Sequence, residues 1–125
     1  GRSLVVGRPA ALLLCAKDAT VTLCHSRTKD LASTLRESEI IVVAAGRAKL
    51  VGGECFAPGQ VVIDVGMNFV NGKLVGDADF AAAEGVVAAI TPVPGGVGAV
   101  TAALLVSNVV RAAMGEKRRA KQTEG

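Results

Sequence analysis

The sequence predicts an α/β domain with a mostly parallel sheet and helices on both faces. Two observations lead to this fold class. Short runs rich in β-branched residues alternate with segments of helical pattern along the chain, and glycines gather where those runs end. A length of 125 residues fits one domain. A chain of this size buries roughly two-thirds of its unfolded surface, so it needs no disulfides to hold a core.

Four short apolar runs are the predicted strands, and their composition predicts burial on both faces. They cover residues 19–24 (ATVTLC), 40–45 (IIVVAA), 61–65 (VVIDV) and 88–91 (AAIT). The predicted helices cover residues 8–17, 28–36, 79–85 and 97–114. Pro9 suits a first helical turn, where its missing N–H needs no partner, and Gly115 suits a helix stop.

Residues 67–75 (MNFVNGKLV) interrupt this alternation. Asn71-Gly72 stands between two short extended pieces and predicts a tight hairpin, because both central positions of that turn favour positive φ. The chain opens on Gly1-Arg2-Ser3, without the strand that usually precedes such a loop. We therefore expect the first strand of the sheet to lie upstream of this sequence.

Charge and composition narrow the class of function. The last ten residues hold four basic and two acidic side chains, so they carry most of the net charge of +3. We expect a domain over residues 1–115 and a disordered basic tail over 116–125. The body is nearly neutral and the chain has no Trp or Tyr, which argues against a nucleic-acid partner.

Cysteine usage and hydropathy bear on localisation. Three cysteines, Cys15, Cys24 and Cys55, cannot all pair, which favours free thiols in a reducing compartment. No apolar run reaches the roughly 20 residues of a membrane span, and the opening residues form no secretory signal. We expect a cytoplasmic protein with no membrane partner.

Polar and glycine residues follow each predicted strand, at the edge where open α/β sheets bind ligands. The opening G-R-S-x-x-x-G, from Gly1 to Gly7, is a variant of the dinucleotide fingerprint. Its small residues let the backbone approach a pyrophosphate, and the following helix offers unpaired N–H groups. An ordinary glycine turn before a helix is the alternative interpretation.

The segment C-H-S-R-T over residues 24–28 bears on the choice between NAD and NADP. An NAD site usually places a carboxylate after the second strand, whereas an NADP site offers basic and hydroxyl groups to the 2′-phosphate. This segment has no carboxylate, so with Arg2 nearby in the expected fold it favours NADP. A capping role for the helix near Thr28 is a compatible alternative.

The remaining motifs do not predict a nucleophile–base pair, a metal site or a P-loop. Cys24 and His25 are adjacent on an extended segment and point to opposite faces, so they do not predict a nucleophile–base pair. One His and three scattered Cys give no metal-ligand spacing. Residues 92–98 (PVPGGVG) lack the Lys-Ser/Thr pair of a P-loop and predict a sharply bent loop, compatible with a cis X-Pro bond. Asp64 is expected to hydrogen-bond locally, and Arg47 to lie in a surface loop.

Five motifs in order carry a resemblance to a known family. They are G-R-S-L-V-V-G-R-P (1–9), A-T-V-T-L-C-H-S-R-T (19–28), V-V-I-D-V-G-M-N (61–68), G-K-L-V-G-D-A-D-F (72–80) and I-T-P-V-P-G-G-V-G (90–98). Together they resemble the C-terminal cofactor domain of the bifunctional methylenetetrahydrofolate dehydrogenase/methenyltetrahydrofolate cyclohydrolases (FolD-type). The resemblance covers nearly the whole chain except the basic tail.

The resemblance implies a Rossmann-like domain that binds NADP and forms a homodimer. It implies an enzyme of one-carbon metabolism and purine biosynthesis that oxidises 5,10-methylenetetrahydrofolate to the methenyl form and hydrolyses that to 10-formyltetrahydrofolate. The implied cofactor-binding residues are Gly1, Arg2, Ser3, His25, Ser26, Gly46 and Met67. The residues implied at the cleft for the tetrahydrofolate derivative are Pro94, Gly95 and Gly96.

Two departures from the family pattern matter. Ala99-Val100 stands where the family usually has Pro-Met. The Tyr-x-x-x-Lys motif that supplies the family's acid/base lysine has no counterpart, since the chain has no Tyr. We therefore expect no catalytic residue in these 125 residues, and expect them alone to bind NADP weakly and to be inactive. A non-catalytic nucleotide-binding or assembly module is the alternative; a short-chain dehydrogenase is disfavoured by the same missing motif.

Overall fold

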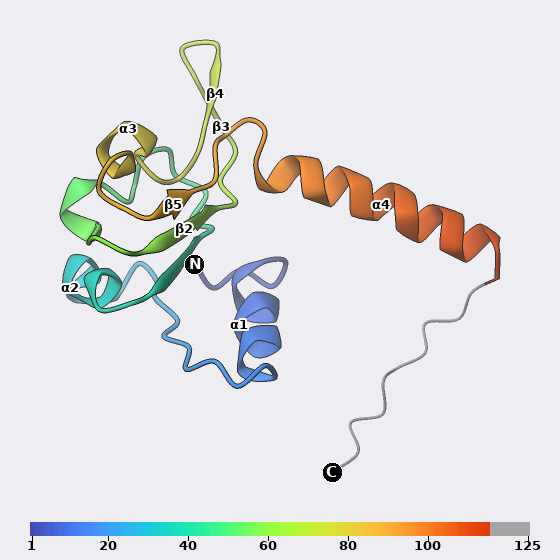
Figure 1. Ribbon diagram of the computed structural model, residues 1–125, viewed down its shortest axis with the longest axis horizontal. Helices are drawn as coiled ribbons and strands as arrows, with labels where there is room; N and C mark the ends of the chain where they lie inside the picture. The colour runs from blue at the N-terminus through green and yellow to red at the C-terminus, as the bar shows by residue number, and fades with distance from the viewer. Residues whose placement is uncertain (116–125) are drawn as a thin grey trace.

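The computed structural model describes residues 1–115 and places a three-stranded parallel sheet at the centre of the fold (Figure 1). The strands are β1 (Ile40–Val43), β2 (Val61–Asp64) and β5 (Ala89–Ile90). Their order in the sheet is β1-β2-β5, so β2 is the central strand. Burial alternates along β1 and β2, which shows one face in the core and the other partly open, instead of the predicted burial on both faces.

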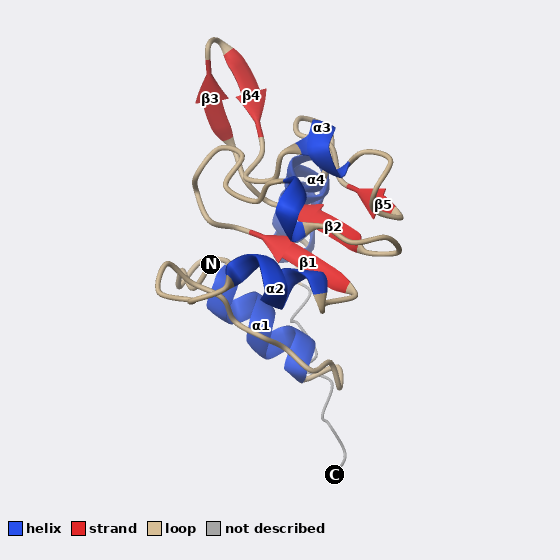
Figure 2. Cartoon of the chain, turned by 90° about the vertical axis from the view of Figure 1, so that its left-hand side faces the viewer, coloured by secondary structure: helices blue, strands red, loops and turns tan. Residues whose placement is uncertain are grey.

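Helices stand on both sides of this sheet. They are α1 (Gly7–Cys15), α2 (Leu31–Arg36), α3 (Phe80–Ala83) and α4 (Val97–Ala113), with a short 3-10 turn, η1 (Gly53–Cys55). In Figure 2, α2 lies in front of β1 and α4 behind β2. The predicted class, a mostly parallel sheet with helices on both faces, is confirmed.

The core lies on one side of the sheet and is mainly aliphatic. Val62, on the central strand, is fully buried. Partly buried residues of α2 and of the segment around β5 pack against the core. The buried apolar residues are Ile41, Val43, Val51, Cys55, Phe56, Val62, Ala78 and Ala83.

The predicted hairpin is confirmed as β3 (Asn68–Val70) and β4 (Lys73–Val75). Asn71 and Gly72 join the strands with φ values of 50° and 75°, as the tight turn requires. The hairpin projects beyond the sheet in both views (Figures 1 and 2). Gly115, with φ of 70°, follows α4 as predicted.

The predicted strand over residues 19–24 is wrong. The segment has no regular secondary structure, no strand within residues 1–115 pairs with it, and Leu23 is 42% exposed. β-Branched composition gives a segment strand propensity, whereas a strand also needs a neighbour for its N–H and C=O groups. The helix predicted from residue 28 begins later, at Leu31, because Asp30 caps it by accepting the Ser33 N–H at 2.9 Å.

Two helices expose apolar side chains. In the described part of the chain neither α1 nor α4 has a buried residue, and Leu12 and Leu105 are 72% and 64% exposed. No helix within residues 1–115 is long and apolar enough to cross a membrane. The predicted disordered tail, residues 116–125, lies outside the described residues.

Candidate functional site

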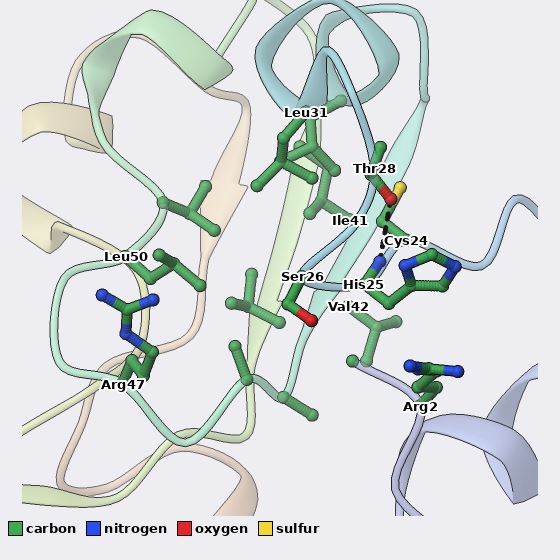
Figure 3. Close-up of a pocket in the computed structure, with 16 residues that line it drawn as sticks. Arg2, Cys24, His25, Ser26, Thr28, Leu31, Ile41, Val42, Arg47 and Leu50 are labelled. Carbon is green, nitrogen blue, oxygen red and sulfur yellow. Dashed lines mark hydrogen bonds between the residues drawn. The ribbon is translucent and has the colours of Figure 1, made fainter.

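A cavity of about 430 Å³ opens at the carboxyl end of β1 (Figure 3). The opening loop, the turn at residues 24–28 and the loop after β1 surround it. Its apolar lining includes Leu31, Leu35, Ile41, Val43 and Leu50. Among residues 1–115, the lining holds three basic side chains and no acidic one; the basic residues are Arg2, His25 and Arg47. The site therefore suits an anionic ligand with an apolar part.

The opening loop packs directly against the end of β1. A Cβ at Gly1 would overlap the carbonyl oxygen of Ala44, so this close backbone approach requires glycine. Gly1 and Arg2, two of the residues expected to bind the cofactor, both line the cavity. Ser3 lies outside the lining, and its Oγ accepts the Gly7 N–H at 3.3 Å, which supports the start of α1.

The turn after residue 24 is held by local hydrogen bonds. The His25 N–H donates to Thr28 Oγ1 at 2.9 Å, and the Arg27 N–H donates to His25 Nδ1 at 3.1 Å. Because Nδ1 accepts, the neutral imidazole carries its proton on Nε2. Figure 3 shows the Ser26 hydroxyl pointing into the cavity and Arg2 beside His25. Three predicted cofactor-binding residues thus face one space.

Arg47 also lines the cavity, although the sequence analysis placed it in a surface loop and not among the cofactor-binding residues. It lies across the cavity from Arg2, with Ser26 between them in Figure 3. The available signal was its position directly after Gly46, where the chain leaves the carboxyl end of β1. Gly46, predicted as a cofactor contact, lies outside the lining, and its N–H donates to Asp77 Oδ2 at 2.6 Å.

Two buried carboxylates join the loops at this edge of the sheet. Asp64 Oδ1 accepts the N–H groups of Gly66 at 2.8 Å and Asp77 at 3.1 Å, and its Oδ2 accepts the Ala78 N–H at 2.8 Å. Asp77 Oδ2 accepts the two successive N–H groups of residues 45–46 at 2.6 Å each. The expectation that Asp64 hydrogen-bonds locally is confirmed for Gly66, whereas its bonds to residues 77 and 78 and the role of Asp77 were not foreseen.

The remaining predicted site residues lie outside the cavity. Met67 precedes β3 and is 74% exposed. Pro94, Gly95 and Gly96 lie in the loop between β5 and α4. The Val93–Pro94 bond in this loop is cis, which agrees with the cis X-Pro bond that the sequence made possible here. Because β1, β2 and β5 run parallel, these residues leave the sheet at the same edge as the cavity.

The cavity also contains a thiol beside the imidazole. Cys24 lines it next to His25 and is half-buried and free. Within residues 1–115 no hydrogen bond joins these two side chains, and no group of three His, Cys, Asp or Glu side chains is placed to hold a metal ion. The geometry thus supports ligand binding by this edge of the sheet and supplies no nucleophile–base pair.

Comparison with known proteins places this arrangement in a family. A family profile described as tetrahydrofolate dehydrogenase/cyclohydrolase, NAD(P)-binding domain, matches residues 1–117. The chain is 61% identical over 115 residues to a bifunctional protein FolD of Parafrankia sp., covering 92% of this chain and 42% of the relative. It is 58% identical to the Chloroflexus aggregans protein of the same name, covering 90% of this chain and 40% of that one. The chain thus spans about two fifths of the length of these relatives.

Solved structures show the same similarity. The bifunctional 5,10-methylenetetrahydrofolate dehydrogenase/cyclohydrolase of Thermoplasma acidophilum matches with a TM-score of 0.85 and 52% identity, over 95% of this chain and 43% of that one. The Trypanosoma brucei enzyme, solved with NADP cofactor and an inhibitor, matches with a TM-score of 0.79 and 47% identity, over 88% and 40% of the two chains. Fold, cavity and sequence agree, and the chain belongs to the tetrahydrofolate dehydrogenase/cyclohydrolase family as its NAD(P)-binding domain.

Proposed function

We propose that residues 1–115 are the NADP-binding domain of a bifunctional enzyme, called the whole enzyme below. This enzyme oxidises 5,10-methylenetetrahydrofolate with NADP+ and hydrolyses the methenyl product to 10-formyltetrahydrofolate. The observation that carries the proposal is the cavity at the carboxyl end of β1, which combines Arg2, Ser26 and His25 and, within the described residues, no acidic side chain. The names of the relatives support the reaction, and the NADP complex of the Trypanosoma brucei enzyme supports the cofactor.

The lining fits the 2′-phosphate end of NADP. A guanidinium and a hydroxyl can both donate to a phosphate, and charge-assisted bonds of this kind are the stronger ones. In NAD sites the corresponding position usually carries Asp or Glu, which would repel the phosphate. Arg2 and Ser26 are proposed to hold the 2′-phosphate, with His25 beside them, while the aliphatic floor at Leu31 and Val43 receives the apolar adenine face.

The backbone near the opening loop is proposed to meet the pyrophosphate. Gly1 lies against β1 without a side chain, so a ligand can approach its backbone closely. Ser3 stabilises this loop by bonding to the start of α1. Gly46 shapes the opposite wall, since its N–H is held by Asp77 and its neighbours line the cavity.

The reacting end of the cofactor is proposed to lie along the same edge, away from the cavity. Met67, after β2, would offer a backbone contact near the nicotinamide, and Pro94, Gly95 and Gly96, after β5, would border the folate cleft. When bound, the nicotinamide supplies the hydride acceptor for the oxidation. The residues of this chain bind and orient it.

Proton transfer is proposed to come from outside this chain. An acid or base must lie within hydrogen-bond reach of the proton that it moves. The lining described here contains no Lys or Tyr, and the 125 residues contain no Tyr at all. We further propose a cytoplasmic homodimer in one-carbon metabolism, with a tetrahydrofolate derivative as substrate and no nucleic-acid or membrane partner.

Substitution of Arg2 tests the cofactor assignment. Arg2→Ala in the whole enzyme should weaken NADP+ binding by roughly 1–3 kcal/mol through loss of one charge-assisted contact. Binding of NAD+, which lacks the 2′-phosphate, should change much less. Isothermal titration with both nucleotides measures the difference. Arg8→Ala is the matched control, because Arg8 is exposed on α1 and lies outside the cavity.

Two outcomes would count against the proposal. Equal losses for NADP+ and NAD+ would remove Arg2 from the 2′-phosphate. An unsubstituted whole enzyme that binds neither nucleotide, or that shows no dehydrogenase activity with 5,10-methylenetetrahydrofolate, would favour a non-catalytic module of the same fold.

A further inference from the structure

The carboxylate that holds the Gly46 N–H does more at this edge than shape one wall. Asp77 is fully buried between the end of the hairpin and the loop after β1. Its Oδ2 accepts the N–H groups of Ala45 and Gly46 at 2.6 Å each, and its Oδ1 accepts the Asn68 Nδ2 at 2.8 Å. One side chain therefore connects two segments that lie more than 30 residues apart in the chain.

The loop that Asp77 holds forms a wall of the nucleotide cavity. Ala44, Ala45 and Arg47 line the cavity, whereas the N–H groups of residues 45 and 46 are bonded to the carboxylate. These amides are therefore not available to a phosphate. Their bonds to Asp77 set the direction in which the loop leaves β1, and with it the position of Arg47 opposite Arg2.

The Asp77 side chain acts only as an acceptor in these bonds, a role that suits a carboxylate. Within residues 1–115, every hydrogen bond to the Asp77 oxygens comes from an uncharged donor. Charge-assisted bonds are about twice as strong as neutral ones, so the ionised carboxylate holds the loop more firmly than an amide would. Asp64 in turn accepts the Asp77 N–H at 3.1 Å, which holds the Asp77 backbone in place at the end of β2.

We infer that Asp77 is a positioning residue for the dinucleotide: it holds the loop at residues 44–47 against the cavity and couples that loop to the hairpin through Asn68. The inference rests on the proposed function, because the ligand is the proposed cofactor. Asp77 touches no ligand itself. Its effect on binding is transmitted by the loop and by the placement of Arg47.

The test compares Asp77→Asn with Asp79→Asn in the whole enzyme. The two substitutions make the same chemical change two residues apart, but the Asp79 carboxylate is half-buried and pairs with Lys49 at 3.3 Å instead of with the loop. Hydrogen exchange, resolved to the amides of residues 45 and 46, should be about tenfold faster in Asp77→Asn and unchanged in Asp79→Asn. The dissociation constant of NADP+ should rise about tenfold in the first variant only.

Reference amides separate local positioning from general loosening. The Val65 N–H donates to the Val43 carbonyl and the Thr91 N–H donates to the Val62 carbonyl, so these two bonds continue the sheet just beyond the ends of β2 and β5. Exchange at these amides should not change in Asp77→Asn. Equal acceleration at the sheet and at residues 45–46 would show a merely structural role and overturn the inference, as would NADP+ binding no weaker than in Asp79→Asn.

Two further outcomes concern a variant that does not fold and an enzyme that does not bind the nucleotide. If Asp77→Asn does not fold, Asn68→Ala removes one of the three bonds and leaves the carboxylate; exchange at residues 45–46 should then rise severalfold, and no rise would refute the coupling to the hairpin. If the unsubstituted enzyme binds no NADP+, the proposed function fails, while the exchange experiment still decides whether Asp77 holds the loop.

Discussion

Substitution of Gly76 by Ala should destabilise the protein strongly. Gly76 is buried beside Asp64, and a Cβ at this position would overlap Asp64 Oδ2. That oxygen accepts the Ala78 N–H at 2.8 Å. Relief of the overlap requires the carboxylate to move, and its movement lengthens the bonds that it accepts.

The size of the effect follows from these contacts. Overpacking a filled site costs about 1–3 kcal/mol, and a lost hydrogen bond to a charged group costs about 1.5–3 kcal/mol. The free energy of unfolding should therefore fall by about 3–5 kcal/mol, a large part of the ~5–15 kcal/mol typical of a domain. For a domain of this size the melting temperature should fall by about 12–20 °C.

Thermal unfolding followed by circular dichroism measures this change. Gly98→Ala is the matched control, since no heavy atom of the described residues lies within 4 Å of the added Cβ and the residue is exposed in α4. That control should leave the protein unchanged or stabilise it by about 0.5 kcal/mol. A melting temperature of Gly76→Ala within about 3 °C of the unsubstituted protein would refute the reasoning, because the carboxylate would then have accommodated the methyl group at almost no cost.

Two other predictions concern buried groups. Gln60 is 3% exposed, and its Nε2 donates to the carbonyls of Leu35 and Ser38 at 2.7 Å each, so Gln60→Ala should lower the free energy of unfolding by about 2–4 kcal/mol in urea titrations. Burial raises the pKa of the Cys55 thiol, and the Glu54 carboxylate raises it further. Above pH 9 the unfolded thiol ionises before the folded one, so the free energy of unfolding should fall with pH; this component should disappear in Cys55→Ala.

Local patterns predicted the hairpin and the central strands well. The Asn71-Gly72 turn depends only on two residues that tolerate positive φ, and the runs at β1 and β2 combine β-branched composition with an apolar core face. The segment at residues 19–24 is also rich in β-branched residues, yet it has no regular secondary structure. It forms no strand because, within residues 1–115, no neighbouring strand pairs with it. Composition gives a segment strand propensity but does not show which segments lie beside it in the fold.

The candidate site was predictable where its residues adjoin a glycine motif or a strand end. Gly1, Arg2, His25 and Ser26 were found in this way, and all four line the cavity. Asp77 was missed because its partners lie 31 and 32 residues earlier in the chain, in a loop with no pattern that points to a carboxylate. Such a contact can be predicted only when the arrangement of these two segments in space is known.

The order of events during folding follows from the pairing of the strands. In the hairpin, Asn68 pairs with Val75 only seven positions away, and hairpins of this kind form within about 1–10 μs. In the sheet, Ile40 pairs with Val61 and Val61 with Ala89, so each ladder closes over an intervening segment of about 20 residues or more. Such distant contacts form slowly because the entropy of the loop is lost before the strands pair. We expect the hairpin to fold early and the edge that surrounds the cavity to become ordered later, when the strands of the parallel sheet pair.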